Sequence, residues 1–330
     1  METMCYYIHA LTALHAGTGQ GVGVVDLPIA REKSTGLPIV PGSGIKGVLR
    51  EELNPSNPGT DDLQPCKDEH GQDQSAEECW LTLFGPDAKN VETGKEGSGF
   101  AGALNIQDAQ LLCLPVRSVY GVFAWVTCPF ILQRYKRDLE QIHCSSLPEF
   151  PALPQQERGS EEAPLVLTAP GSALAPSGKV FLEDLDFQVA DDSAGQTTVG
   201  QLAERIAGAV FSTDADWKKF FKERFLIIPD NVFSFLAETA TEVRARIKLK
   251  EGTRTVEEGA LWYEENLPAE TLLWGIIGCD RSRRDKDGPN ADQLMQHFRD
   301  EIGMEKSLQI GGNATVGRGR VRWIPGPVGG

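Results

Sequence analysis

Apolar and polar residues alternate along several stretches of the 330-residue chain, as they do in strands that bury one face. This alternation predicts strand regions over 5–14, 100–114, 116–126 and 179–189. A further stretch over 271–279 is apolar throughout, which indicates a strand buried on both faces. Near the end of the chain, a glycine-rich loop is expected to enter a last strand within 308–323.

Apolar residues at helical spacing predict helices over 45–53, 77–84, 199–211, 215–225 and 291–302. Asn54 and Pro55 stop the first of these helices. Residues 55–74 and 146–177 are rich in the residues that favour loops, so we interpret them as loops or linkers. Together, these elements have the strand–helix–strand spacing of an α+β fold with a ferredoxin-like or RRM-type core.

A β-hairpin is predicted over 241–261, because charged and apolar residues alternate in the first half of this stretch. The basic residues Arg244, Arg246, Lys248 and Lys250 share one face, and the apolar residues between them share the other. Residues 251–252 can form the turn, after which the chain can return as a second strand. The hairpin would therefore carry one basic face.

The net charge of −15 argues at first against a nucleic-acid partner, because phosphate contacts need local positive potential. However, the acid is concentrated in two stretches. Residues 51–108 have a net charge of −10 and residues 155–216 a net charge of −8, which leaves +3 for the remainder. We interpret the acidic stretches as solvated insertions, so they weaken the objection to a nucleic-acid partner without removing it.

Two glycine-rich turns lie between 15 and 50. Glycines 17, 19, 21 and 23 lead to Asp26, and the segment 41–44 leads into the helix predicted from residue 45. We expect Ser43 to N-cap this helix and Lys46 to stand beside its free N–H groups, which together form a phosphate cradle. The spacings of a dinucleotide fingerprint and of a P-loop are both absent, because the required glycine and the Ser or Thr after Lys46 are missing.

The seven cysteines, an odd number without framework spacing, predict reduced thiols in a cytoplasmic protein. No segment has the pattern of a signal peptide or of a membrane span. Cys66, His70 and Cys79 do not have the spacing of a structural zinc site, and a metal at these residues is not favoured.

Four blocks resemble the RAMP superfamily of CRISPR proteins, and in particular the repeated backbone subunit of type III-B (Cmr) effector complexes. They are GTGQGVGVVDLPIARE at 17–32, GLPIVPGSGIKGVLR at 36–50, LWYEENLP at 261–268 and GGNATVGRG at 311–319. The blocks keep the order of that family and span nearly the whole chain. The resemblance implies one RAMP-type domain over 1–330, with acidic insertions at about 51–100 and 145–200 and a protruding thumb hairpin at about 236–268.

The resemblance also implies a site and a function. Asp26 corresponds to the aspartate that this family needs to cut target RNA, and His15, at the end of the first strand, is a candidate assistant. Asp26 would either take the proton of the 2′-OH nucleophile or help to hold a weakly bound divalent cation such as Mg²⁺ or Mn²⁺. The expected RNA-binding residues are Ser43, Lys46, Arg50, Arg244, Arg246, Lys248, Gly312, Arg318 and Arg320.

The implied partners are a guide crRNA, a single-stranded target RNA, further copies of the chain in a helical filament, and other Cmr subunits. No membrane partner is expected. Two alternatives stay open at this point. One is a scaffold that packages crRNA without cutting, which has no need of Asp26. The other is the related backbone subunit of type III-A (Csm) complexes, although the Arg-Glu after DLPI and the LWYEE block favour type III-B.

Overall fold

The computed structural model describes the whole chain except residues 20, 22–24, 58–64, 68–69, 88–90, 92–98, 145–146, 151–152, 154–162, 251, 253–254, 286, 304 and 329–330. The predicted turn residues 23 and 251 therefore lie outside the described part. Among the described residues, no helix is both long and apolar enough to cross a membrane.

One 12-stranded mixed sheet runs through the molecule in the order β15-β16-β1-β14-β6-β7-β11-β8-β10-β9, with β2 beside β6 and β5 beside β14. Its central strands β1 (Glu2–Ala10) and β14 (Leu272–Cys279) pair antiparallel along their whole length. The other strands are β2 (Ile39–Val40), β5 (Leu104–Ile106), β6 (Ala109–Arg117), β7 (Phe123–Thr127), β8 (Leu165–Thr168), β9 (Lys179–Leu182), β10 (Leu185–Val189), β11 (Phe225–Ile227), β15 (Lys306–Gln309) and β16 (Arg320–Val328).

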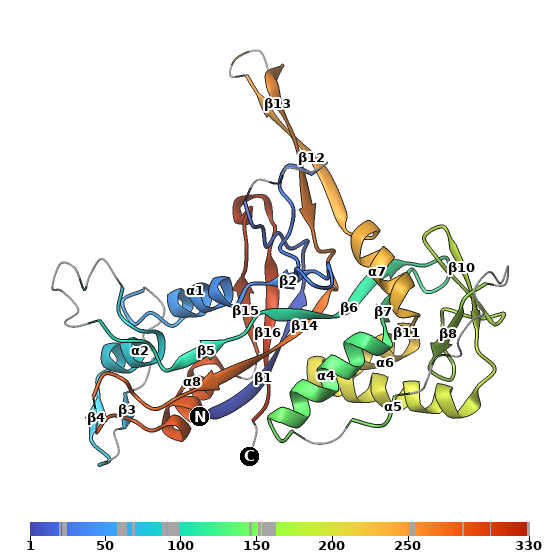
Figure 1. Cartoon of the computed structure of the whole chain (residues 1–330). Helices are drawn as coiled ribbons and strands as arrows, with labels where there is room; N and C mark the ends of the chain where they lie inside the picture. The colour runs from blue at the N-terminus through green and yellow to red at the C-terminus, as the bar shows by residue number, and fades with distance from the viewer. Residues whose placement is uncertain are drawn as a thin grey trace.

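The helices form two groups, which lie on either side of β1 and β14 in Figure 1. One group consists of α1 (Gly42–Glu52), α2 (Ala76–Phe84) and α8 (Ala291–Ile302), and the other of α4 (Pro129–Gln141), α5 (Ser193–Val210), α6 (Ala215–Arg224) and α7 (Asp230–Thr239). Side chains alternate along β1, so Tyr6 and Ile8 enter the hydrophobic cluster of the first group, whereas Cys5 and Tyr7 enter that of the second. Burial on both faces explains why β14 is apolar throughout.

The predicted hairpin is confirmed as β12 (Glu242–Leu249) and β13 (Val256–Asn266), which form a separate two-stranded sheet. It protrudes from the body of the molecule at the top of Figure 1. The face that was predicted to be basic is mixed in charge, because three of its cations pair with carboxylates. These pairs are Arg244 with Glu242, Arg246 with Glu264, and Lys248 with Glu257.

Most sequence-predicted elements are present, and the departures have local causes. Helix α5 begins at Ser193 rather than 199, because the Asp192 side chain caps it by accepting from Gly195 N. The single strand predicted over 179–189 is a hairpin of β9 and β10 that turns at Glu183, whose φ is 48°. The predicted linker over 146–177 contains the buried strand β8. The sequence pattern did not predict helix α4, whose first position is occupied by Pro129.

Candidate functional site at the root of the hairpin

Asp26 lies where the glycine-rich first loop meets the hairpin. Leu27 pairs in parallel with β13, donating its N–H to Tyr263 O and accepting from Glu265 N, each at 3.0 Å. The side chain of Asp26 is exposed, and its Oδ2 accepts a 2.8 Å hydrogen bond from Tyr263 N. Gly21 N donates to Asp26 O at 2.8 Å. The carboxylate is thus oriented by the backbone while it faces solvent.

His15 is held by the same strand two residues further on. Its Nδ1 lies 2.6 Å from Glu265 O, and the ring is buried. A carbonyl oxygen can only accept, so Nδ1 carries the proton and the lone pair of the neutral ring is on Nε2. Gly17 faces Nε2, where a Cβ would approach to 2.6 Å, so the glycine keeps this nitrogen clear. The anchor points of Asp26 and His15 on β13 are about 7 Å apart.

Glu265 ties the first loop to the hairpin, and sequence reasoning did not single it out. Its carboxylate accepts from Ile29 N at 3.1 Å, from the Arg31 guanidinium at 2.5 Å and from the Thr241 hydroxyl at 2.9 Å. Arg31 also donates to Gly36 O and to Ala237 O at the end of α7. The Arg-Glu of the first block and the Glu-Glu of the third were visible only as parts of a resemblance. Nothing in the sequence showed that Arg31 and Glu265 form a pair.

The glycine-rich loop 311–319 packs against the same root. Gly312 N donates to His15 O at 3.0 Å, and a Cβ on Gly311, whose φ is 80°, would strike that carbonyl oxygen. Asn313 Nδ2 donates to Glu264 Oε2 at 3.0 Å, while Glu264 Oε1 accepts from Trp262 Nε1 at 2.8 Å. Three of the four sequence blocks therefore meet at one place, although the first lies more than two hundred residues before the other two.

The arginines of the last block differ in their surroundings. Arg318 is buried beside Glu242, 4.0 Å from its carboxylate, and one guanidinium nitrogen, Nη1, has no hydrogen-bond partner within the described chain. Burial, reinforced by the nearby cations Arg244 and Arg246, lowers the pKa of Arg318. In contrast, Arg320 is exposed at the start of β16, and Gly312 is exposed in the loop. These three predicted RNA-binding residues thus lie together around the hairpin root.

The phosphate cradle predicted at α1 is wrong. The helix begins at Gly42 with Pro41 as its N-cap, so Ser43 lies inside the first turn and makes no capping hydrogen bond. The Asp108 carboxylate accepts from Gly42 N at 2.7 Å and already occupies the anion position at this helix end. Lys46 Nζ donates to Leu104 O at 2.8 Å, and burial lowers its pKa.

Arg50 is also engaged inside the fold. Its guanidinium stacks over the Trp80 ring, 4.3 Å from the centroid, and donates to Gly85 O. Trp80 Nε1 in turn donates to Arg50 O at 2.8 Å. Ser43, Lys46 and Arg50 therefore lie outside the site at the hairpin root, and their RNA contacts stay a prediction.

The described residues contain no group of three or more His, Cys, Asp or Glu side chains that could hold a metal ion. Cys66 and Cys79 are joined in a disulfide, which corrects the expectation of reduced thiols at these two positions. The five other cysteines are free and buried.

Comparison with known proteins identifies the family. A family model described as the RAMP superfamily matches residues 7–322. The chain therefore belongs to the RAMP superfamily, as the sequence blocks predicted. Within it, the chain is 35% identical over 326 residues to the CRISPR system Cmr endoribonuclease Cmr4 of Pyrococcus furiosus, covering 98% of this chain and 95% of that protein.

Solved structures agree with this assignment. The crystal structure of oligomeric Cmr4 from Pyrococcus furiosus matches with a TM-score of 0.65 and 29% identity, covering 99% of this chain and 98% of that one. A subunit in the cryo-EM structure of the type III-B Cmr-beta bound to cognate target RNA matches with a TM-score of 0.67 at 18% identity, covering 98% and 96%. The latter likeness concerns the fold alone. Together, these matches confirm the predicted α+β RAMP-type fold.

Proposed function

We propose that the chain is the repeated backbone subunit of a type III-B (Cmr) CRISPR ribonucleoprotein, which binds crRNA and cleaves complementary target RNA at regular intervals in defence against viruses. The relative named as a Cmr endoribonuclease aligns with 98% of this chain. The observation that carries the proposal is the placement of Asp26. Its carboxylate is exposed, yet it is oriented by Tyr263 N at the root of a protruding hairpin.

The proposed chemistry uses the nucleophile that RNA itself carries. The 2′-OH attacks the neighbouring phosphorus, the bond to the 5′-oxygen breaks, and the products are a 2′,3′-cyclic phosphate and a 5′-OH. Asp26, the primary catalytic residue in this proposal, accepts the 2′-OH proton or orients the sugar for in-line attack. His15 assists through Nε2, the nitrogen left with a lone pair when Nδ1 donates to Glu265 O.

A weakly bound divalent cation, Mg²⁺ or Mn²⁺, remains part of the proposal. The described residues offer no ready-made cage. However, Mg²⁺ commonly binds through one or two carboxylates together with substrate phosphates and retained waters. Asp26 would be the protein ligand, and the cation would stabilise the charge that develops on the phosphate.

The proposed partners are crRNA, single-stranded target RNA, further copies of the chain in a filament, and other Cmr subunits, all in the cytoplasm. Arg244, Arg246, Lys248, Gly312, Arg318 and Arg320 would contact RNA. These contacts are expected to read the backbone and shape of the guide–target duplex, because base pairing supplies the sequence.

The test is cleavage of end-labelled complementary RNA by complexes assembled with a guide RNA. Wild-type complex should cut at evenly spaced positions, and Asp26→Ala should abolish the cuts while target affinity stays within about twofold, because the side chain is exposed and contributes little to folding. Asp184→Ala, which removes an exposed carboxylate in the turn between β9 and β10, is the matched control and should cut normally.

Two outcomes would revise the proposal. Binding without cuts in the wild-type complex would favour the non-catalytic scaffold, and normal cutting by Asp26→Ala would remove Asp26 from the mechanism. Addition of a chelator tests the role of the cation independently of the nuclease assignment. Cleavage that persists without divalent metal would exclude the cation and leave the nuclease assignment standing.

A further inference from the structure

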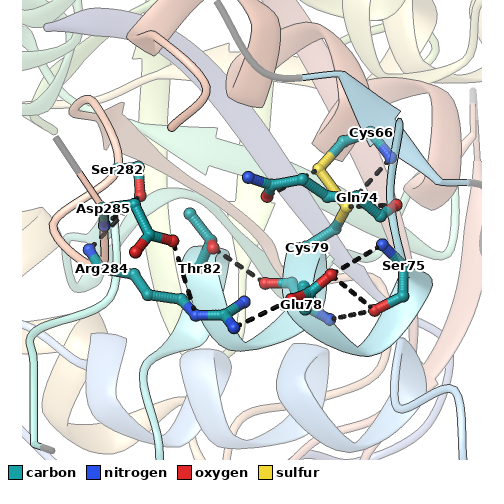
Figure 2. Close-up of polar contacts among 9 residues, drawn as sticks. All are labelled: Cys66, Gln74, Ser75, Glu78, Cys79, Thr82, Ser282, Arg284 and Asp285. Atoms are coloured by element: carbon teal, nitrogen blue, oxygen red, sulfur yellow. Dashed lines mark hydrogen bonds and ion pairs between the residues drawn. A yellow bond between two sulfur atoms is a disulfide. The ribbon is translucent and has the colours of Figure 1, made fainter. Parts of the chain in front are cut away.

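The disulfide between Cys66 and Cys79 links a short hairpin covalently to helix α2, in addition to the contacts that the hairpin makes with α8. It joins β3 (Cys66–Lys67) to α2, and β3 pairs only with β4 (Asp73–Gln74), so each strand of this small sheet has two residues. Neither cysteine belongs to either of the two hydrophobic clusters. Because so short a hairpin is marginal on its own, the covalent link to α2, drawn in Figure 2, helps to fix its position.

Thiol chemistry is confined to this pair. The five other cysteines are free but buried, and burial raises the pKa of each thiol, to about 12 for Cys5 and Cys279. Because the thiolate is the form that attacks a disulfide, these thiols are inert near neutral pH. An external thiol therefore has a single target among the cysteines of this chain.

The two sulfurs of the pair have different roles. Both cysteines are buried, but Cys66 is 5% exposed and Cys79 is fully buried, so Cys66 is the one of the two that lies nearer to solvent. Cys66 N donates to Cys79 Sγ at 2.9 Å, and Cys79 is the fourth residue of α2, near the positive end of the helix. Both features stabilise negative charge on Cys79, which makes it the better leaving group.

The disulfide adjoins the start of α2. Ser75 and Glu78 form a capping box around the first turn, with Ser75 N donating to Glu78 at 3.0 Å. Arg284, from the segment between β14 and α8, donates to the same Glu78 at 2.9 Å. Figure 2 shows the disulfide, the capping box and Arg284 side by side. A change at the disulfide therefore acts on the helix start and on the segment that carries Arg284.

We propose that Cys66–Cys79 is a thiol–disulfide exchange site whose redox state decides whether the β3–β4 hairpin is fixed to α2. A dithiol attacks Cys66 Sγ, the Cys66–Cys79 bond breaks, and Cys79 leaves as a thiolate. The second thiol of the reductant then attacks the mixed disulfide and releases Cys66, so one dithiol is oxidised and two cysteines are reduced. A low-molecular-weight disulfide reverses the reaction by two exchanges and is itself reduced to two thiols.

One further argument rests on the proposed function. A protein that works in the cytoplasm meets a reducing thiol pool, where protein disulfides are usually transient and redox-responsive rather than permanent. The other arguments are independent of it, and the experiment below measures no RNA cleavage. Failure of this proposal and failure of the nuclease assignment are therefore distinguishable.

The experiment uses the full chain, equilibrated with oxidised glutathione or with dithiothreitol. Native alkylation and peptide mass spectrometry should find Cys66 and Cys79 blocked by the disulfide in the first state and alkylated in the second. Hydrogen exchange should accelerate about 100-fold on reduction at the β3 and β4 amides, as expected from opening a loop of this length, and the amides of β1 and β14 should not change.

Variants give the control. Cys66→Ser with Cys79→Ser should exchange like the reduced wild-type protein in both buffers, and Cys144→Ser should keep the full response. Free Cys66 and Cys79 thiols in oxidised glutathione would overturn the proposal. So would a disulfide that resists dithiothreitol in the native protein, or hairpin exchange rates that are the same in both states.

Discussion

Glu265 offers the sharpest test of how the hairpin root is built, because one carboxylate accepts from three groups in two distant segments of the chain. Its partners are Ile29 N in the first loop, the Arg31 guanidinium, and the Thr241 hydroxyl just before β12. We expect Glu265→Ala to loosen the hairpin and the first loop together, since groups from both donate to this one carboxylate.

The magnitude follows from what each partner loses. Ile29 is buried, and an N–H left there without an acceptor costs about 1–3 kcal/mol. The Arg31 side chain is 24% exposed and keeps two carbonyl partners, so its loss is discounted to about 1 kcal/mol. The Thr241 hydroxyl can turn to water at almost no cost. The sum is about 2–4 kcal/mol, and Glu265→Gln should lose about half of that, because it keeps an acceptor for Ile29.

Hydrogen exchange at the amides of Leu27 and Leu267 measures this loosening directly. Both amides donate hydrogen bonds within the root, Leu27 N to Tyr263 O and Leu267 N to Leu14 O. Exchange should accelerate by about 30- to 700-fold in Glu265→Ala. Glu257→Ala on the same hairpin breaks only an exposed ion pair with Lys248 and should change these rates less than about threefold. Equal rates in wild type and Glu265→Ala would refute the idea that this carboxylate holds the root.

Two further predictions concern residues of helices α8 and α1. Burial lowers the pKa of His297 below 6.5, so the unfolded chain binds the proton more readily than the folded one. The stability of the protein should therefore fall as the pH drops below 6.5. In His297→Gln this part of the pH dependence should be absent from urea midpoints measured between about pH 5 and 8. Arg50→Ala should lower stability by about 1–2 kcal/mol through loss of its contacts with Trp80 and Gly85. The RNA affinity of the assembled complex, measured on the same variant, tests the predicted RNA contact of Arg50, and an unchanged affinity would exclude it.

The sequence pattern predicted the fold well where one face of an element decides its structure. The hairpin of β12 and β13, the all-apolar β14 and helix α8 are present as their periodicity indicated. Helix α1 is present as well, but its start was misjudged. Ser43 is a good capping residue by type, yet Asp108, 66 residues away in sequence, supplies the acceptor at Gly42 N. A cap made by a distant residue leaves no local signal.

The candidate site was predictable only in part for the same reason. Asp26 and the loop 311–319 were found through resemblance, because an exposed aspartate after glycines is by composition an ordinary turn. The contacts that give Asp26 an orientation come from the backbone of Tyr263, and a backbone donor has no residue-type signature. Similarly, Arg31 and Glu265 are ordinary charged residues until the fold brings them to 2.5 Å.

The charge distribution around the hairpin explains how an acidic protein can still receive RNA. Arg244 and Lys248 pair with glutamates, but their side chains are 54% and 68% exposed, so these pairs are worth little and a phosphate can replace the carboxylate. Arg318 is buried at the root, where its cation balances Glu242. The exposed cations are thus the most accessible to a phosphate backbone, whereas the buried Arg318 lies against Glu242 at the root. Arg244→Ala and Lys248→Ala should therefore each weaken the salt dependence of RNA binding. Arg318→Ala should mainly loosen the hairpin, because it removes the buried cation beside Glu242.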